Sequence, residues 1–158
     1  MGLSVVPVQS DGDLDQVRTL FREYAASLDI DLAFQGFDAE LATLPGNYAP
    51  PRGVLLLARD GRQALGCVGV RSVDAPGVCE MKRLYVRPAG RGSGAGRALA
   101  NEAVAFARAT GYREMLLDTL PQMAAAIRLY RTLGFKEIPP YGHGLPGMLY
   151  FGKQLQPD

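Results

Sequence analysis

Three local signals follow one another in the run Arg83-Leu84-Tyr85-Val86-Arg87-Pro88-Ala89-Gly90-Arg91-Gly92-Ser93-Gly94-Ala95-Gly96-Arg97-Ala98-Leu99. An apolar strand-like segment ends at a proline, a turn rich in glycine and arginine follows, and an Ala/Leu-rich helical pattern begins directly behind it. Such a turn presents several backbone N–H groups to one point, and the helix N-terminus adds partial positive charge. The run therefore predicts an anion site for a phosphate or pyrophosphate, to which Arg91 and Arg97 can add charged hydrogen bonds.

Two common phosphate-binding motifs do not fit this turn. A P-loop requires a lysine directly after its last glycine, and no lysine follows the glycines of this turn. A dinucleotide fingerprint requires Gly-x-Gly-x-x-Gly, and the spacing Gly92-x-Gly94-x-Gly96 puts Arg97 at the position of the third glycine. The strand before the turn also reads as the second arm of a hairpin, whereas a dinucleotide fingerprint follows the first strand of a βαβ unit.

The composition is that of a soluble globular protein. The chain has 158 residues, of which 47% are hydrophobic and 21% charged, so one domain over residues 1–158 is expected. Its 17 Lys and Arg nearly balance its 16 Asp and Glu, which argues against a nucleic-acid binder. No apolar run is long enough to span a membrane, and residues 1–6 lack the features of a signal peptide, so a cytoplasmic location is expected.

The two cysteines, Cys67 and Cys79, both lie in apolar strand-like runs. A hairpin turn at residues 74–77 would put Cys67 opposite Leu84 and Cys79 opposite Ser72. The two thiols are therefore not expected to meet in a disulfide. Two cysteines and a single histidine also make a poor metal site, so no metal is expected.

The remaining patterns predict a mixed α/β fold with a mostly antiparallel sheet. Tight turns separate the strands up to residue 86, and a helical crossover then leads to a strand that should run parallel to its predecessor. Residues 29–51 are the least regular part, and they form either a packed connector or a functional lid. The expected strands are 3–8, 53–59, 63–73, 78–86, 114–119, 136–138 and 148–153, and the expected helices are 14–28, 37–44, 93–110 and 123–133.

The segment Arg91-Gly92-Ser93-Gly94-Ala95-Gly96 resembles the Arg/Gln-x-x-Gly-x-Gly/Ala acyl-CoA signature of the GNAT superfamily of N-acetyltransferases. A second segment, Ala126-Ile127-Arg128-Leu129-Tyr130-Arg131-Thr132-Leu133-Gly134-Phe135, is similar to the Ala-x-x-x-Tyr-x-x-x-Gly-Phe ending of the same superfamily. The expected elements follow the family's order over nearly the whole chain. The resemblance implies the GNAT fold, a mixed and mostly antiparallel sheet of six to seven strands with about four helices, in which the fourth and fifth strands are parallel and splayed.

The resemblance also implies a reaction, in which a primary amine of a small molecule or peptide attacks the thioester of acetyl-CoA directly within a ternary complex. The glycine turn would hold the pyrophosphate, and the edge of the preceding strand would pair with the pantetheine amides. The co-substrate contacts carried over in this way are Leu84, Tyr85, Val86, Arg91, Gly92, Ser93, Gly94, Ala95, Gly96 and Arg97.

Tyr130 occupies the family's usual general-acid position, where it would protonate the leaving thiolate. A phenol with a pKa of about 10 keeps its proton at neutral pH and can donate it. The alternative is a core aromatic residue, because Ala126, Tyr130 and Leu133 share one face of the predicted helix.

Glu80 is the candidate base that would remove a proton from the amine, because a glutamate at this place serves as the base in histone-acetylating relatives. Strand alternation predicts that Glu80 shares a face with Lys82, Leu84 and Val86. The alternative is a cross-strand ion pair with Arg71, which the hairpin register puts opposite Glu80. Many members of the family use a chain of water molecules in place of a base.

Several other residues are candidates for contacts with the co-substrate or the acceptor. Met123 stands where the family often has a cofactor-binding asparagine, so that contact is in doubt. Asp118 and Thr119 end the parallel strand near the expected thioester and could bind acceptor or water, and Tyr24 could project toward an acceptor. His143, in the final glycine-rich loop, is a base or acceptor contact only if that loop reaches the site.

Two functions are compatible with this sequence. The first is an acetyl-CoA-dependent N-acetyltransferase whose acceptor amine the sequence does not identify. The second is a catalytically inactive acyl-CoA-binding module that acts as a sensor or interaction partner. Dimers are frequent in the family, so a homodimer is one expected assembly.

Overall fold

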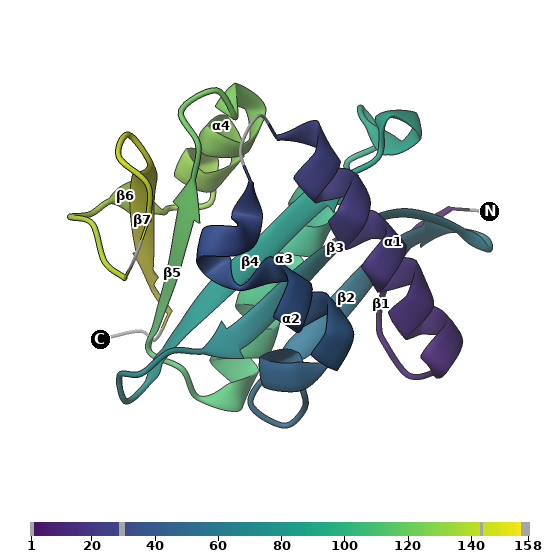
Figure 1. Cartoon of the computed structure of the whole chain (residues 1–158), viewed down its shortest axis with the longest axis horizontal. Helices are drawn as coiled ribbons and strands as arrows, with labels where there is room; N and C mark the ends of the chain where they lie inside the picture. Colours follow the sequence, from purple (N-terminus) through teal and green to yellow (C-terminus); the bar gives the residue numbers. More distant parts are fainter. Residues whose placement is uncertain (1, 29–30, 143, 156–158) are drawn as a thin grey trace.

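The computed structural model describes residues 2–28, 31–142 and 144–155 (Figure 1), and every expected strand and helix is present. The strands are β1 (Leu3–Pro7), β2 (Val54–Asp60), β3 (Gln63–Ser72), β4 (Val78–Val86), β5 (Glu114–Thr119), β6 (Lys136–Glu137) and β7 (Leu149–Gln154). The α-helices are α1 (Asp11–Ser27), α2 (Phe37–Thr43), α3 (Ala95–Thr110) and α4 (Ala124–Thr132). Short 3-10 helices lie at Leu32–Gln35, Gly46–Tyr48 and Pro88–Gly90.

All described strands belong to one seven-stranded sheet with the order β1-β2-β3-β4-β5-β7-β6. Neighbouring strands are antiparallel except for β4 and β5, which are parallel as predicted. The helix α3 makes the crossover between these two strands, as a parallel pair requires. The strand β7 lies between β5 and β6, an order that the local sequence pattern does not specify.

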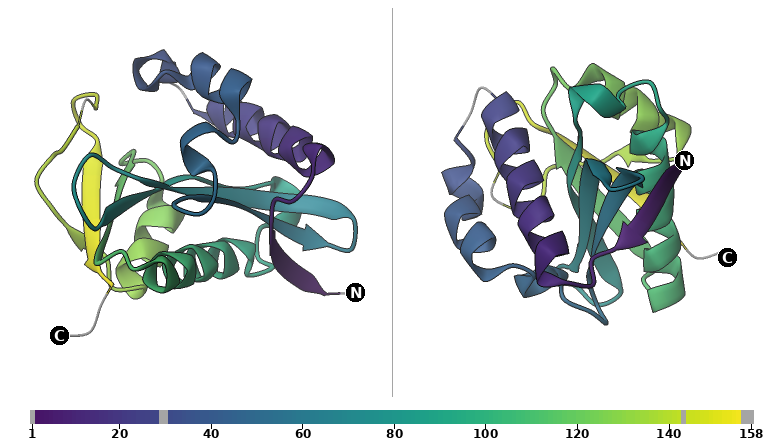
Figure 2. Two further views of the ribbon diagram at one scale, coloured as in Figure 1. Left: turned by 90° about the horizontal axis from the view of Figure 1, so that it is seen from below. Right: turned by 90° about the vertical axis from the view of Figure 1, so that its right-hand side faces the viewer.

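Helices cover both faces of the sheet (Figure 2). The helices α1 and α2 lie on one face, and α3 and α4 lie on the other. Because both faces are covered, β2 is apolar at every central position, and its side chains alternate between the two cores. Leu55 and Leu57 join the core under α1, between that helix and the sheet, while Val54 and Leu56 join the core under α3 on the opposite face. Within the described residues, no helix is both long and apolar enough to cross a bilayer.

Glycines set the ends of the helix that follows the central turn. The predicted helix 93–110 is two residues too long at its start, because Gly94 has a φ of 89° and caps the helix from outside. Gly111, with a φ of 98°, ends the helix as predicted, and a left-handed backbone of this kind favours glycine.

A bulge in β4 changes which side chains share a face. Lys82 pairs with Gly69, but Tyr85 pairs with Cys67, so β4 contains one residue more than β3 between these pairs. Arg83 lies inside the bulge with a φ of 62°. The prediction that Cys67 faces Leu84 was therefore wrong by one position.

The same bulge changes which side chains share a face of the sheet with Glu80. Cys79 and Met81 point into the core under α3, so Glu80 and Lys82 point to the opposite face. After the extra residue, Leu84 and Val86 also pack against the α3 core. Glu80 thus shares a face with Lys82, but not with Leu84 or Val86, because a bulge shifts the alternation by one residue.

The described part of the segment 29–51 is largely a packed connector. Leu32, Phe37, Leu44 and Tyr48 are all buried in the core under α1. These four side chains hold α2 and the two flanking 3-10 helices against the sheet. Residues 29 and 30 lie outside the described part.

Candidate active site

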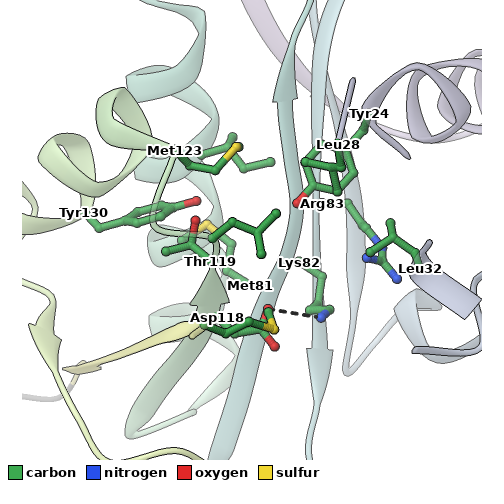
Figure 3. Close-up of a pocket in the computed structure, with 13 residues that line it drawn as sticks. Tyr24, Leu28, Leu32, Met81, Lys82, Arg83, Asp118, Thr119, Met123 and Tyr130 are labelled. Carbon is green, nitrogen blue, oxygen red and sulfur yellow. Dashed lines mark ion pairs between the residues drawn. The ribbon is translucent and has the colours of Figure 1, made fainter. Parts of the chain in front are cut away.

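The strands β4 and β5 separate at the centre of the sheet. Their parallel ladder contains the pairs Val78–Glu114, Cys79–Met115 and Glu80–Leu116, and within the described residues it does not continue beyond the last of them. A narrow gap of about 30 Å³ lies past that point, which is room for roughly one water molecule. Its lining residues are Tyr24, Leu28, Leu32, Met81, Lys82, Arg83, Leu84, Asp118, Thr119, Leu120, Met123, Tyr130 and Met148 (Figure 3).

Tyr130 lies on α4, and its side chain points into this gap (Figure 3). The residue is only 6% exposed, and its ring packs edge-on against Phe135 at 5.9 Å and near Phe151 at 6.3 Å between ring centroids. Burial raises the pKa of Tyr130 above its ordinary value. The phenol is thus held rigidly, remains protonated at neutral pH and presents its hydroxyl to the gap. Tyr130 is therefore a packed core aromatic residue that also lines the gap, and its role as general acid stays a prediction.

The glycine turn places open backbone in front of α3. Gly92 and Gly94 have φ values of 82° and 89°, and a Cβ added to either would meet no atom within 4 Å. The amides of Gly96 and Arg97 lie in the first helical turn, where an α-helix offers no carbonyl acceptor. At Gly90 a glycine is needed for packing, because a Cβ there would lie 3.0 Å from the Cβ of Leu65. The turn therefore presents helix-start amides to an open surface.

Serine and arginine side chains complete the turn. Ser93 donates a hydrogen bond to the carbonyl of Gly90, and its hydroxyl accepts one from the amide of Ala95 at 3.2 Å. Arg91 and Arg97 are exposed, and Arg97 donates to the hydroxyl of Thr132 on α4 at 3.3 Å. The predicted anion site is thus an accessible surface with two cations at its rim.

The strand end that leads to the turn is tied to α1. The guanidinium of Arg87 donates to both carboxylate oxygens of Glu23, at 2.7 and 2.9 Å. Hydrogen bonds from Arg87 lower the pKa of Glu23. The ring of Tyr85 packs edge-on against Tyr24 at 6.1 Å, so its side chain faces α1 and leaves only its backbone available at the strand edge. These contacts fix the position of Leu84, Tyr85 and Val86.

Glu80 lines a second, wider cavity of about 500 Å³ beside the gap. Its Oε1 accepts two hydrogen bonds from Arg71, at 3.0 and 3.2 Å, and its Oε2 accepts one from Tyr141 at 2.7 Å. The predicted cross-strand pair of Arg71 and Glu80 is confirmed. Glu80 does not line the gap that holds the Tyr130 hydroxyl.

An ion pair that the sequence reasoning missed joins β4 to β5. The Nζ of Lys82 lies 3.5 Å from Oδ1 of Asp118, and the two side chains are 4% and 16% exposed (Figure 3). Burial lowers the pKa of Lys82, and Asp118 only partly offsets that effect. A signal was available in the sequence, because Glu80, Lys82 and Arg83 put three charges into a strand that is otherwise mostly apolar.

A second buried ion pair fixes the bulge to α2. Arg83 donates to both oxygens of Glu40, at 3.0 and 3.1 Å, and its guanidinium lies 5.2 Å from the centre of the Phe37 ring. The side chains of Arg83 and Glu40 are 2% and 10% exposed. The bulge, the gap and the connector between α1 and β2 are therefore one packed unit.

Several of the residues that the sequence singled out line the gap, whereas Glu80 and the turn residues 91–97 do not. Tyr130, Thr119, Asp118, Met123 and Tyr24 all line it. Met123 occupies the position just before α4, so its thioether replaces the polar side chain that the family often has there. The predicted role of His143 lies outside the described residues.

A mixed sheet whose parallel fourth and fifth strands open around a buried tyrosine, with a glycine turn at a helix start, defines an acyltransferase-like architecture. The acetyltransferase (GNAT) family model matches residues 15–135, and the chain belongs to this family. It is 44% identical over 155 residues to an uncharacterized N-acetyltransferase of Schizosaccharomyces pombe, covering 97% of this chain and 95% of that one.

Solved structures share the fold. A GNAT-family acetyltransferase from Staphylococcus aureus superposes with a TM-score of 0.81 at 17% identity, covering 98% of this chain and all of the other. The PaiA N-acetyltransferase of Thermoplasma acidophilum, solved in complex with coenzyme A, superposes with a TM-score of 0.75 at 19% identity and covers 98% and 99% of the two chains.

Proposed function

We propose that the protein is an acetyl-CoA-dependent N-acetyltransferase that acts on a primary amine by direct attack in a ternary complex. The observation that carries this proposal is the gap between β4 and β5, into which the Tyr130 hydroxyl points from one side. The gap marks the place where the two strands stop pairing, so a thioester that lies along the β4 edge would have its sulfur near the Tyr130 hydroxyl. The relative from Thermoplasma acidophilum was crystallised with coenzyme A, which is consistent with this assignment.

The residues present fit a coenzyme A thioester. Helix-start amides at Gly96 and Arg97, with the open backbone at Gly92 and Gly94, suit a pyrophosphate. Arg91 and Arg97 can add charge-assisted hydrogen bonds to the same anion. A side chain at Gly92 or Gly94 would point into the space that such a ligand needs.

The strand edge fits the pantetheine arm. Beyond Glu80, β4 has no ladder pair with β5 in the described residues, so its edge at Leu84, Tyr85 and Val86 is unpaired on that side, and Leu84 lines the gap. Amide groups of an extended ligand can pair with this edge as an added strand would. Because Leu84 and Val86 pack into the α3 core and Tyr85 packs against Tyr24, the edge is rigid before any ligand arrives.

Tyr130 is the proposed general acid. Its hydroxyl would hydrogen-bond the departing thiolate and donate a proton to it, a role that requires a phenol that keeps its proton at neutral pH. The raised pKa keeps the proton on the phenol at neutral pH, and the tight packing against Phe135 and Phe151 fixes the ring in place for this role.

Glu80 was the sequence-based candidate for the base, and that role stays a prediction. Its contacts favour the structural alternative. One carboxylate oxygen accepts from the Arg71 cation and the other from the Tyr141 hydroxyl. Both carboxylate oxygens of Glu80 are therefore engaged in structural contacts, one with β3 and one with Tyr141.

The deciding experiment measures acetyl-CoA binding and turnover separately. Calorimetry gives the Kd of acetyl-CoA, and thiol release is followed with spermidine, phenethylamine, L-lysine and a short peptide with a free N-terminus. Release of coenzyme A that depends on an amine, with the acetylated amine detected by mass spectrometry, is the expected result. Tight binding with no turnover of any amine would favour the inactive acyl-CoA-binding module.

A further inference from the structure

The two cavities of the candidate site meet at one ion pair. Lys82 and Asp118 line the narrow gap that also holds Tyr130, and they line the wider cavity that also holds Glu80 and Tyr141. The Lys82 ammonium and the Asp118 carboxylate are 3.5 Å apart, one on each of the separating strands. The pair, shown by the dashed line in Figure 3, therefore lies where the two cavities meet, and we call it the partition between them.

The positions of the two cavities suit different ligands, the thioester in the narrow gap and the acceptor amine in the wider cavity. The narrow gap lies between the β4 edge and Tyr130, where the proposed function puts the thioester. The wider cavity, at about 500 Å³, is large enough for a small amine or a peptide end. An amine that enters through the wider cavity must pass the partition before it reaches the thioester carbon.

An amine arrives in water mostly as an ammonium ion, and it must lose a proton before it can attack. Three buried groups lie near the partition and could take that proton. Glu80 already accepts from Arg71 and Tyr141. Asp118 pairs with the Lys82 ammonium in this structure, and a buried lysine that has released its proton has a lone pair to offer as a base.

We propose that the Lys82–Asp118 pair is the proton acceptor for the substrate amine, with Asp118 holding the incoming ammonium and neutral Lys82 taking its proton. This inference rests on the proposed N-acetyltransferase function and names the base for it. It also implies a cationic acceptor, because the entering group is recognised as an ammonium by a carboxylate.

The proton and electron balance closes with groups that are present. The substrate ammonium gives one proton to Lys82, and its nitrogen then forms a C–N bond to the acetyl carbon as the C–S bond breaks. Tyr130 gives its proton to the leaving sulfur, and the new amide nitrogen returns a proton to the Tyr130 oxygen. Lys82 releases its extra proton to solvent through the wider cavity.

Burial, more than the surrounding charges, lowers the pKa of Lys82 and supports a neutral lysine during turnover. Asp118 on β5 and Glu80 on β4 favour its ammonium form, while Arg83 on β4 and Arg71 on β3 oppose it. Burial, the largest effect, lowers the pKa of Lys82. A substrate ammonium beside Asp118 would lower it further, because it competes for the same carboxylate.

Kinetics of variants test the inference. Lys82→Met removes the amine, and Lys82→Arg keeps a charge that cannot be lost near neutral pH. Both should lower kcat/KM for the amine by about 100-fold or more and remove the inflection that wild-type activity shows as pH rises through the Lys82 pKa. The Kd of acetyl-CoA should stay within about threefold, and Lys136→Arg, on the exposed strand β6, is the matched control. A Lys82→Arg enzyme with the wild-type rate and pH profile overturns the inference.

A titration that needs no turnover gives the second readout. The chain's lysines are Lys82, Lys136 and Lys153, so side-chain NMR of lysine-labelled protein resolves few signals. The signal missing from Lys82→Met should titrate at lower pH than the signal missing from Lys136→Arg. In Asp118→Asn it should titrate lower still, because the carboxylate that stabilises the Lys82 ammonium is gone. Equal titration of Lys82 and Lys136 overturns the inference. A wild type that binds acetyl-CoA and acetylates no amine contradicts the proposed function instead.

Discussion

At the scale of single residues, Tyr130 combines two duties that mutation can separate. Tyr130→Phe keeps the ring and its packing against Phe135 and Phe151, and it removes only the hydroxyl that points into the gap. We expect kcat to fall by about 100-fold, since general acids contribute roughly that much or more, while the KM for acetyl-CoA changes little. Steady-state kinetics at saturating amine measure both quantities.

Tyr112→Phe is the control for that change. Tyr112 is equally buried, but its hydroxyl donates to the carbonyl of Arg52 at 2.7 Å, away from the gap. We expect this variant to lose stability and to keep its kcat. Full activity in Tyr130→Phe would show that the tyrosine is only a core residue.

The variant Glu80→Gln distinguishes the two possible roles of the carboxylate, catalytic base and structural partner of Arg71. The amide keeps the shape but weakens the contacts to Arg71 and Tyr141, which should reduce the free energy of unfolding by about 1 kcal/mol. If Lys82 is the base, the pH inflection of kcat/KM survives in this variant, and the KM of the amine rises because the loop at Tyr141 loosens. Loss of the inflection in Glu80→Gln, with its retention in Lys82→Arg, would return the base role to Glu80.

Of the ion pairs that Glu80 and Lys82 make at the candidate site, the sequence predicts one and not the other. The pair of Arg71 and Glu80 was predictable because a tight turn fixes the antiparallel register next to it. The pair of Lys82 and Asp118 was not, because it depends on where two parallel strands stop pairing after a long crossover. No local pattern specifies that point.

At the scale of elements, the glycine turn and α3 act together as the expected anion site. Gly94→Ala forces a left-handed residue at the helix start, which should cost about 1 kcal/mol of stability, and it puts a methyl group into the ligand's space. We expect the Kd of coenzyme A to rise by about tenfold, measured by calorimetry on folded protein.

The other end of the same helix supplies the control. Gly111 has nearly the same backbone, with φ 98° and ψ 7° against 89° and 6° at Gly94, and its Cβ would also meet no atom within 4 Å. Gly111→Ala should cost similar stability and leave the Kd unchanged. Equal effects of the two variants on the Kd would mean that the turn does not touch the co-substrate.

Element boundaries were largely predictable, and the bulge was not. Turn residues and helix-ending glycines mark the chain clearly, so the strands and helices lie close to where the sequence predicts them. The extra residue at Arg83 is held by its buried pair with Glu40, which is far away in sequence. The error about the face of Leu84 and Val86 follows from that tertiary contact.

At the scale of the whole molecule, the sheet consists of two parts joined by a short ladder. The strands β1 to β4 form one part, β5 to β7 form the other, and three register pairs connect them at one end. The buried pair of Lys82 and Asp118 makes one more bridge. A ligand that pairs with the β4 edge and contacts Tyr130 on α4 would join the two parts where the sheet lacks hydrogen bonds.

We therefore expect coenzyme A to stabilise the molecule unevenly. At a concentration one hundred times its Kd, a ligand adds about 2.7 kcal/mol to the free energy of unfolding. For a chain of this size that corresponds to a rise in Tm of roughly 5–10 °C, measurable by calorimetry. Amide hydrogen exchange should show added protection at Leu84 to Val86 and in the first turn of α3, while β2, which pairs with β1 on one side and β3 on the other, serves as the internal reference. Protection spread evenly over the sheet would mean that the ligand does not bridge the gap between β4 and β5.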